Sequence, residues 1–296
     1  MSYCVHNVQS CGDTGWRING VSGCPILSLS FKKCDEKMKT VSLESLDLSY
    51  DDRLVVKGLN LRFEKPEIVS IIGANGSGKS TMLKSIGRLL RPRKGVVALN
   101  GKDIHTLPAR VVARDMSILP QSPHAPDDIT VKDLVSFGRT PYRNFFGSNG
   151  NDDAEIIRWA LKETNIESFA YRSVNTLSGG ERQRAWIAMA LAQKTGIMLL
   201  DEPITFLDIH HQFEIMELLQ RLNEKYNITV IMVIHDLNHA AKFSHRIIAV
   251  KHGNVVRDGT PAKVITEETL SEVFGIKAQI LSMNGSIICI PYGVCR

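Results

Sequence analysis

Hydrophobic and polar positions alternate in the first patterned part of the chain. Over residues 41–50, VSLESLDLSY, alternate positions are mainly apolar, which is typical of a strand with one buried face. Residues 59–63 alternate likewise, and Asp51 with Asp52 predicts a turn between the two strands. We therefore expect an antiparallel β subdomain at the start of the folded region.

The pattern changes from residue 68 onward, where short apolar runs alternate with segments of helical period. The runs are residues 68–72, 197–200, 229–234 and 247–250. Continuous apolar strands are buried on both faces, which predicts a mainly parallel sheet with helices on each side. Between residues 130 and 171 the pattern is mainly helical, with a Gly- and Asn-rich interruption at 147–151. The sequence therefore predicts an α/β domain that carries an inserted helical subdomain at about residues 122–176.

The two ends of the chain differ from its centre. Residues 1–37 are rich in Cys, Gly, Ser and Asn and lack a sustained period, so they can bury little apolar surface to offset the entropy of ordering. We predict that this extension is disordered or results from an upstream start choice. A regulatory or metal-sensing tail is the alternative interpretation. The patterned domain is expected to span residues 38–275, with a C-terminal β extension at 276–296.

Size, charge and cysteine placement narrow the class of protein. The 296 residues suffice for one large domain or two small ones, and a net charge of +5 from scattered basic residues argues against a nucleic-acid partner. No apolar run approaches the ~18–20 residues of a spanning helix, and the start lacks a secretory pattern. The six cysteines form no C-x-x-C pair, so neither a zinc site nor a disulfide framework is expected. We expect a soluble cytoplasmic chain that reaches a membrane only through a partner.

A phosphate-binding loop follows the first apolar run. Residues 73–80, GANGSGKS, fit G-x-x-x-x-G-K-[ST] between the strand at 68–72 and a predicted helix at 79–90. Its glycines let backbone N–H groups turn toward phosphate oxygens, and the helix N-terminus adds the positive end of its dipole. Lys79 is expected to reach the β- and γ-phosphates, and the Ser80 hydroxyl to ligate Mg²⁺. The expected ATP-binding residues of this loop are Gly73, Asn75, Gly76, Ser77, Gly78, Lys79, Ser80 and Thr81.

Two carboxylates end another apolar run, IMLLDE at residues 197–202. Asp201 is placed to hold Mg²⁺, and Glu202 to polarise the attacking water. Alone, such a pair is more often a helix cap or a loop charge, but a phosphate-binding loop upstream favours the catalytic interpretation. These features still leave kinases, GTPases, helicases and transport ATPases open.

Residues 177–184, LSGGERQR, distinguish among these classes. Ser178 can cap the following helix, while Gly179 and Gly180 permit close backbone approach. A second helix N-terminus aimed at phosphate is redundant within one chain. It is useful if it meets the γ-phosphate held by a second copy of the chain.

This octet resembles the signature of ABC ATPases, and the resemblance covers about residues 41–274. It implies a P-loop NTPase core that binds ATP and Mg²⁺ and a pair of chains that sandwich the nucleotides. By resemblance, Tyr50 stacks on adenine, Gln121 senses the γ-phosphate and contacts Mg²⁺, Asp208 contacts the opposing subunit, and His235 is the switch histidine. The implied catalytic residues are Glu202, His235 and Gln121. Ile204 departs from the family, which usually has Thr there.

Five segments are similar to the ferric-siderophore and vitamin B12 importer ATPases: residues 119–126, 129–131, 138–141, 208–212 and 235–238. The resemblance implies transmembrane permease subunits as partners, a substrate-binding protein as an indirect partner, and a peripheral place on the cytoplasmic face of the inner membrane. It implies uptake of an iron-siderophore chelate. The alternatives are a vitamin B12 or heme importer, a soluble ABC ATPase of repair or translation, and a small-molecule kinase, against which the octet argues.

Overall fold

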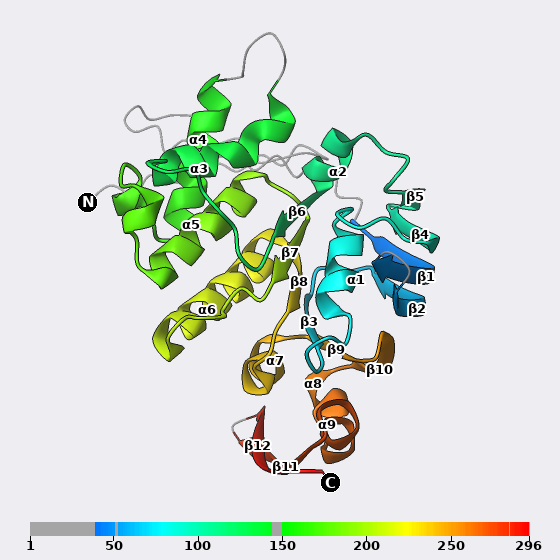
Figure 1. Ribbon diagram of the computed structural model, residues 1–296. Helices are drawn as coiled ribbons and strands as arrows, with labels where there is room; N and C mark the ends of the chain where they lie inside the picture. The colour runs from blue at the N-terminus through cyan, green and yellow to red at the C-terminus, as the bar shows by residue number, and fades with distance from the viewer. Residues whose placement is uncertain (1–38, 51–52, 144–149, 284, 296) are drawn as a thin grey trace, which may run out of the picture. The chain divides into compact units, whose positions relative to one another are not determined.

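The computed structural model describes residues 39–50, 53–143, 150–283 and 285–295. The predicted N-terminal extension and the turn at Asp51 and Asp52 lie outside the described residues. An antiparallel sheet is built from β1 (Val41–Tyr50), β2 (Arg53–Phe63), β4 (Lys94–Leu99) and β5 (Lys102–Asp103), in the order β2-β1-β4-β5 (Figure 1). The strand predicted at residues 59–63 is therefore the second half of a longer strand, and the antiparallel subdomain is confirmed.

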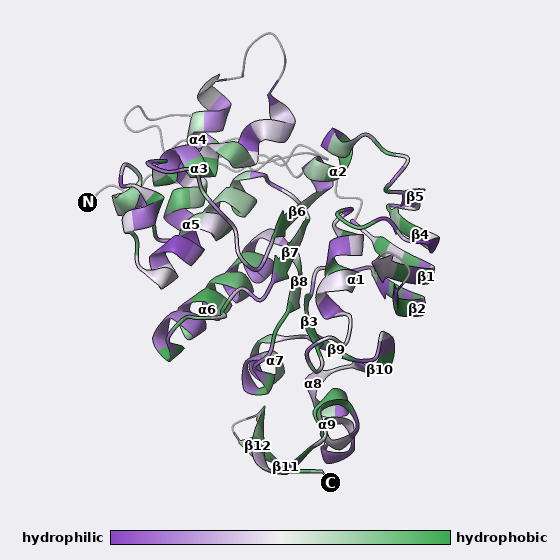
Figure 2. Ribbon diagram, in the orientation of Figure 1, coloured by the Kyte–Doolittle hydropathy of each residue, from purple (hydrophilic) through white to green (hydrophobic). Residues whose placement is uncertain are grey.

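A six-stranded sheet forms the centre of the domain. Its order is β10-β9-β3-β8-β7-β6, from the strands β10 (Asn254–Gly259), β9 (Arg246–Lys251), β3 (Ile68–Ile72), β8 (Thr229–Val233), β7 (Ile197–Asp201) and β6 (Met116–Leu119). All pairs are parallel except β10 with β9. Every residue of β3, β7 and β8 is buried, as expected for strands covered on both faces. Figure 2 shows these central strands coloured mainly as hydrophobic.

Alternate residues of β3 enter two separate hydrophobic cores. Val69 and Ile71 belong to the core that includes helix α1 (Lys79–Ile86) and the antiparallel sheet. Ile68 and Ile72 belong to the core that includes α6 (Ile209–Tyr226) and the inserted helices. Figure 1 shows α1 and α6 on opposite sides of the strands. The sheet therefore separates two packed layers.

Helix α1 is shorter than the 79–90 segment predicted from sequence. It ends at Ile86, and Arg88 has a left-handed φ of 63°. A Cβ built at Gly87 would lie 2.6 Å from the Ile118 Cδ1, so a larger residue at the helix end would require the Ile118 side chain to shift. Pro92 follows soon after, where it cannot continue a helix. The error arose because Leu89 and Leu90 extend the apolar period past the true end.

The inserted segment is helical, as predicted. It contains α3 (Val131–Ser136), the 3₁₀ turn η1 (Phe137–Tyr142) and α4 (Gly150–Glu163), with two further 3₁₀ turns at Glu167–Phe169 and Val174–Thr176. These pack on α5 (Gly179–Ala192) around a shared core. Helix α4 begins inside the predicted Gly- and Asn-rich interruption, whose first residues lie outside the described part of the chain. A short helix α2 (Ala109–Asp115) precedes β6.

The C-terminal part follows α7 (Leu237–Phe243) and contains α8 (Pro261–Val264), α9 (Glu267–Phe274) and a hairpin of β11 (Ile276–Met283) and β12 (Ser286–Val294). Sequence periodicity did not resolve α8 and α9, because neither exceeds 8 residues. The Asn238 side chain accepts from the Cys289 N–H at 2.8 Å and donates to the Cys289 carbonyl at 3.2 Å, which ties β12 to α7. Within the described residues, none of the helices is both long and apolar enough to cross a bilayer.

Candidate functional site

The loop between β3 and α1 adopts a conformation that depends on its glycines. Gly73 has φ +154°, and a Cβ there would lie 2.3 Å from the Val250 carbonyl oxygen of β9. The Ser77 N–H donates to the Ala74 carbonyl at 3.2 Å, and the Gly253 N–H donates to the Ser77 carbonyl at 2.8 Å. The loop is thus held tightly against the β9–β10 turn.

The Lys79 ammonium lies within this loop. Its Nζ donates to the carbonyl oxygens of Gly73 at 2.8 Å and Ala74 at 2.9 Å, and the residue is buried. Burial lowers the pKa of Lys79, while the carboxylates of Glu202 and Asp201 oppose that shift. A cation is therefore positioned where the loop and the two carboxylates meet.

Two hydroxyl groups of the same segment fit a magnesium nucleotide. The Ser77 Oγ is buried and has no hydrogen-bond partner among the described residues, so it is available to a phosphate oxygen. The Ser80 Oγ donates to the Asp201 Oδ1 at 2.9 Å. Burial raises the pKa of Asp201, opposed by the Ser80 hydrogen bond. A hydroxyl and a carboxylate side by side form the hard oxygen set that Mg²⁺ prefers.

The Glu202 carboxylate forms the centre of a second hydrogen-bonded group of side chains. Its Oε2 accepts from the Gln121 Nε2 at 2.7 Å and from the Thr205 Oγ1 at 3.1 Å, and its Oε1 lies 2.6 Å from the His235 Nε2. Burial raises the pKa of Glu202, but the bond and charge of His235, with Thr205 and Gln121, outweigh burial and lower it. The ionised carboxylate can only accept, so the Nε2 atom of His235 carries the proton.

The backbone of Glu202 separates the two adjacent carboxylates. Asp201 ends β7, whereas Glu202 has a left-handed φ of 54° and its N–H donates to the Val233 carbonyl of β8 at 3.1 Å. This conformation costs a non-glycine residue roughly 1–3 kcal/mol and is concentrated at functional sites. As a result Asp201 meets Ser80, and Glu202 meets Gln121 and His235.

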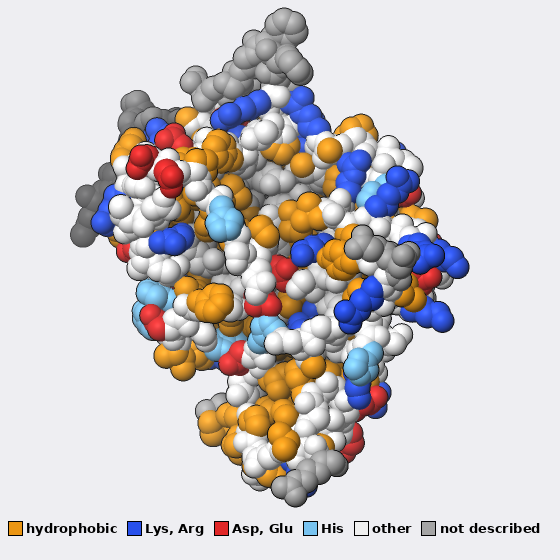
Figure 3. Space-filling view, in the orientation of Figure 1, with side chains coloured by type: hydrophobic (Ala, Val, Ile, Leu, Met, Phe, Trp, Pro, Cys, Tyr) orange, Lys and Arg blue, Asp and Glu red, His pale blue; other side chains and the backbone are white. Residues whose placement is uncertain are grey.

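Most of these residues line one cavity of 520 Å³, whereas Gly73, Ser77 and Asp201 do not line it. The predicted site residues that line it are Asn75, Gly76, Gly78, Lys79, Ser80, Thr81, Gln121, Glu202 and His235. Figure 3 shows acidic, basic and histidine side chains close together near the middle of the face in view. The cavity combines a phosphate-binding loop, a buried lysine and an oriented carboxylate. These are the functional groups that hydrolysis of a phosphoanhydride requires.

Other predicted residues do not line this cavity. Tyr50 lies at the end of β1, 44% exposed. Ser178 caps α5, accepting from the Glu181 N–H at 3.3 Å, while the Glu181 carboxylate accepts from the Ser178 N–H at 2.8 Å. Asp208 caps α6, accepting from the His211 N–H at 3.0 Å. The helix cap expected of Ser178 is therefore present, and neither it nor its glycines line the cavity of its own chain.

Sequence reasoning missed two residues of the cavity. Thr205 donates to Glu202, and Phe206 lines the cavity although it is 94% exposed. The signal for Thr205 was its place three residues after the carboxylate, where a hydroxyl can reach back across a turn. Ile204, the departure from the family, is 5% exposed and belongs to the helical-side core, so it leaves the cavity unchanged.

Comparison with known proteins agrees with this geometry. A family model described as ABC transporter matches residues 56–205, which include the phosphate-binding loop, Gln121, the octet and both carboxylates. The iron(3+)-hydroxamate import ATP-binding protein FhuC of Bacillus subtilis (strain 168) is 48% identical over 261 residues, which are 88% of this chain and 97% of that protein. The ferric enterobactin transport ATP-binding protein FepC of Escherichia coli (strain K12) is 41% identical over 252 residues, 84% and 93% of the two chains.

Solved structures share the fold. A transporter assigned to the metal-chelate type of ABC transporters, in an inward-facing conformation, matches with a TM-score of 0.75 and 27% identity, over 87% of this chain and 98% of that one. A dimeric ATP-binding cassette in a post-hydrolysis state with ADP and Pi matches with a TM-score of 0.67 and 33% identity, over 75% of this chain and 98% of that one.

Proposed function

Because this chain belongs to the ABC transporter family, as one of its ATP-hydrolysing subunits, we propose that it couples ATP binding and hydrolysis to the import of an iron-siderophore chelate. The observation that carries the ATPase mechanism is the meeting of Lys79, the Ser80–Asp201 pair and the Glu202 group at one cavity. The cargo assignment has its support in the names of the relatives.

The phosphate-binding loop supplies the binding half of the mechanism. Backbone N–H groups of residues 73–80, the Ser77 hydroxyl and the Lys79 ammonium bind the phosphate oxygens, and Tyr50 contacts the adenine. Ser80 and Asp201, with Gln121, would hold Mg²⁺. When bound, this ion neutralises charge that develops on the phosphate oxygens. Binding the phosphates requires Lys79 to exchange its two carbonyl partners for phosphate oxygens.

Glu202 supplies the proton-accepting half. Its carboxylate accepts a proton from the attacking water as the water oxygen bonds to the γ-phosphorus and the bond from that phosphorus to the leaving ADP breaks. The donors Gln121, Thr205 and His235 keep this carboxylate ionised and fixed, as its lowered pKa indicates. His235 lines the cavity, so its Nε2–H can exchange the Glu202 oxygen for a terminal phosphate oxygen when ATP binds. Positioning and electrostatic stabilisation carry most of the catalysis.

Two copies of the chain complete the sites. Residues 178–180 do not line the cavity of their own chain, and the similar ATP-binding cassette with ADP and Pi is a dimer. We therefore assign Ser178, Gly179 and Gly180 to the nucleotide held by the second copy, and Asp208 to the contact between the copies. Contacts made only in the closed dimer supply the free energy of closure.

The transport role places the dimer on transmembrane permease subunits at the cytoplasmic face of the cell membrane, with a substrate-binding protein delivering the cargo. FhuC is named for iron(3+)-hydroxamate import and FepC for ferric enterobactin transport. A groove lined by residues of the 119–126 segment, with Asn175, Arg182 and Trp186, supports permease contact there.

The test is uptake by the source organism with this gene deleted. Complementation with the parent chain should restore uptake of a radioiron-labelled siderophore, and the Lys79→Ala chain should not. Labelled vitamin B12 is the matched cargo control, and its uptake should be independent of the gene. Loss of vitamin B12 uptake on deletion, with siderophore uptake unchanged, would refute the cargo assignment and leave the ATPase mechanism standing.

A further inference from the structure

The two glycines at the start of α5 lie against the segment that begins α6. A Cβ built at Gly180 would lie 2.5 Å from the Cγ and 2.7 Å from the Nδ1 of His211. A Cβ at Gly179 would lie 3.3 Å from the Leu207 Cδ2. The backbone of the signature segment, residues 178–180, therefore rests directly on the Asp208 loop, residues 206–209, and on the first turn of α6.

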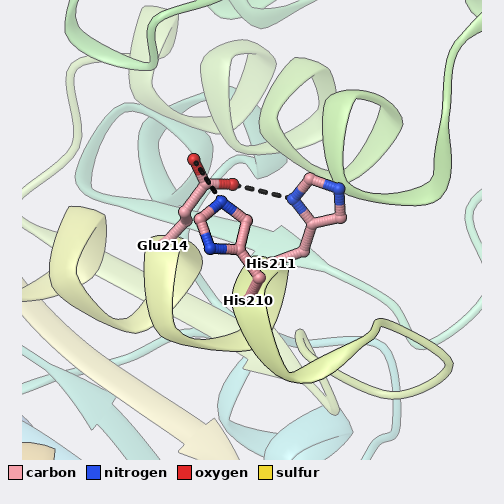
Figure 4. A group of neighbouring side chains, drawn as sticks. All are labelled: His210, His211 and Glu214. Carbon is pink, nitrogen blue, oxygen red and sulfur yellow. Dashed lines mark hydrogen bonds and ion pairs between the residues drawn. The ribbon is translucent and has the colours of Figure 1, made fainter.

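The His211 ring is held by a charged carboxylate. Its Nδ1 lies 2.7 Å from the Glu214 Oε2, and the Arg184 Nη1 of α5 donates to the same oxygen at 2.7 Å. Burial raises the pKa of Glu214, but the bonds from His211 and Arg184 outweigh burial and lower it. The carboxylate is thus ionised and accepts from both, so the Nδ1 of His211 carries a proton. Figure 4 shows the His211–Glu214 bond on the first turn of α6.

His211 also reaches the Asp208 loop. Its backbone N–H donates to the Asp208 Oδ1 at 3.0 Å, and its Nε2 lies 3.8 Å from the Asp208 Oδ2. The Gln212 Nε2 donates to the Leu207 carbonyl at 2.9 Å, which fixes the same loop from the next residue. The His211 ring therefore touches the signature glycine and the carboxylate that anchors α5, while the backbone N–H of the same residue bonds to the α6 cap, Asp208.

The same cluster offers metal-ligand atoms, but its charges oppose a cation. Ligand atoms of His210, His211 and Glu214 lie within 4.8 Å of one another. The guanidinium of Arg184 already contacts the carboxylate of Glu214, so a metal ion would have to displace a fixed positive charge. His210 is 78% exposed and stands 3.7 Å from Glu214. The arrangement fits a structural link between α5 and α6 better than an ion site.

We propose that His211 is a positioning residue that holds the signature segment in register with the Asp208 loop, so that both are presented to the second copy as one preformed surface. The inference rests on the proposed function, in which the signature of one copy completes the ATP site of the other. A preformed surface loses less conformational freedom on association, so it closes at a lower ATP concentration. The His211 ring acts through Gly180 and Glu214 and does not itself touch the nucleotide.

The test uses mixed dimers in which only one site is intact. A Lys79→Ala chain paired with a Ser178→Arg chain leaves one site, whose phosphate loop comes from the Ser178→Arg chain and whose signature comes from the Lys79→Ala chain. We expect His211→Ala to lower ATPase about tenfold when it is on the Lys79→Ala chain, the loss typical of a removed charged hydrogen bond. The same substitution on the Ser178→Arg chain should change ATPase by less than about twofold.

His210→Ala is the matched control, since it removes an exposed histidine from the same turn and should leave both pairs unchanged. If His211→Ala lowers the melting temperature into the assay range, His211→Asn replaces it, because its amide nitrogen stands close to the place of Nδ1. Equal losses on both chains, or no loss on either, would overturn the inference while the shared site stands. A parent pair that forms dimers without ATPase would overturn the shared site and, with it, this inference.

Discussion

A methyl group at Gly73 should destabilise the fold far more than one at Gly76, three residues along the same loop. At Gly73 the new Cβ would lie 2.3 Å from the Val250 carbonyl oxygen and 2.7 Å from the Ser77 Oγ. Val250 belongs to β9, which pairs on both sides, so its carbonyl cannot move cheaply. At Gly76 nothing lies within 4 Å of the new Cβ.

The two costs can be worked from these geometries. Gly73→Ala carries overpacking of roughly 1–3 kcal/mol and the strain of alanine at φ +154°, again about 1–3 kcal/mol, for a total of about 2–6 kcal/mol. Gly76→Ala carries only the left-handed strain of φ +75°, about 1–2 kcal/mol, partly offset by the lower entropy of its unfolded chain.

Guanidinium denaturation of both variants without nucleotide measures the difference. Gly101→Ala, with φ +76° and open space around its Cβ, is a control outside the loop and should match Gly76→Ala. The reasoning is refuted if Gly73→Ala loses no more free energy of unfolding than Gly76→Ala. That result would mean the loop does not lie against β9, and the orientation of its N–H groups toward phosphate would lose its support.

Three further predictions concern the carboxylates and the C-terminal hairpin. Thr205→Val removes a donor that lowers the pKa of Glu202, so the acid limb of the ATPase pH profile should move to higher pH; an unmoved limb contradicts this. Burial raises the pKa of Asp201, so its ionised form destabilises the fold at neutral pH. Asp201→Asn should therefore have a higher melting temperature at pH 7 while losing ATPase. This gain in melting temperature should vanish as the pH falls through the pKa of Asp201. A melting temperature that drops at pH 7 would argue against that burial cost. Asn238→Ala removes both hydrogen bonds to the Cys289 backbone, which lowers the local stability of β12 by about 2 kcal/mol. Thiol labelling of Cys289, followed by peptide mass spectrometry, should therefore become faster. Unchanged labelling would mean that other contacts hold β12.

Hydrophobic pattern predicts the central strands closely and helix ends poorly. The runs at 68–72, 197–200 and 229–234 match β3, β7 and β8 within one residue, because strands buried on both faces are mainly apolar throughout. The polar Ser70 at the centre of β3 is buried and bonds to the Ser244 hydroxyl at 2.7 Å. The helix predicted at 79–90 fails at its end, because periodicity reports which face is buried and not where the backbone turns.

The residues of the site also differ in how well the sequence predicts them. The phosphate loop and the acidic pair are contiguous motifs, so local spacing predicts them. The bonds from Glu202 to Gln121 and His235 join residues 81 and 33 positions apart, and the resemblance supplied those partners where spacing could not. Neither source predicts the left-handed φ of Glu202, which decides where its carboxylate points.

The contact of His211 with Gly180 is also beyond sequence reasoning. Two histidines stand side by side in the chain, at positions 210 and 211, and no pattern distinguishes them. The fold exposes the first and packs the second on the signature segment. Tertiary packing alone assigns them different roles.

The central claim is that Glu202 is the base of an ATP site closed by two copies. The measurement is the molar mass and the ATPase rate of Glu202→Gln with saturating ATP and Mg²⁺, beside the parent chain. Glutamine has a similar shape and keeps one acceptor oxygen for the neighbouring donors, but it cannot take the proton, so hydrolysis should fall roughly 100- to 10,000-fold while ATP still binds. Glu202→Gln with ATP should therefore form a stable dimer. Hydrolysis near the parent rate, or an ATP-bound chain that remains monomeric, would contradict it.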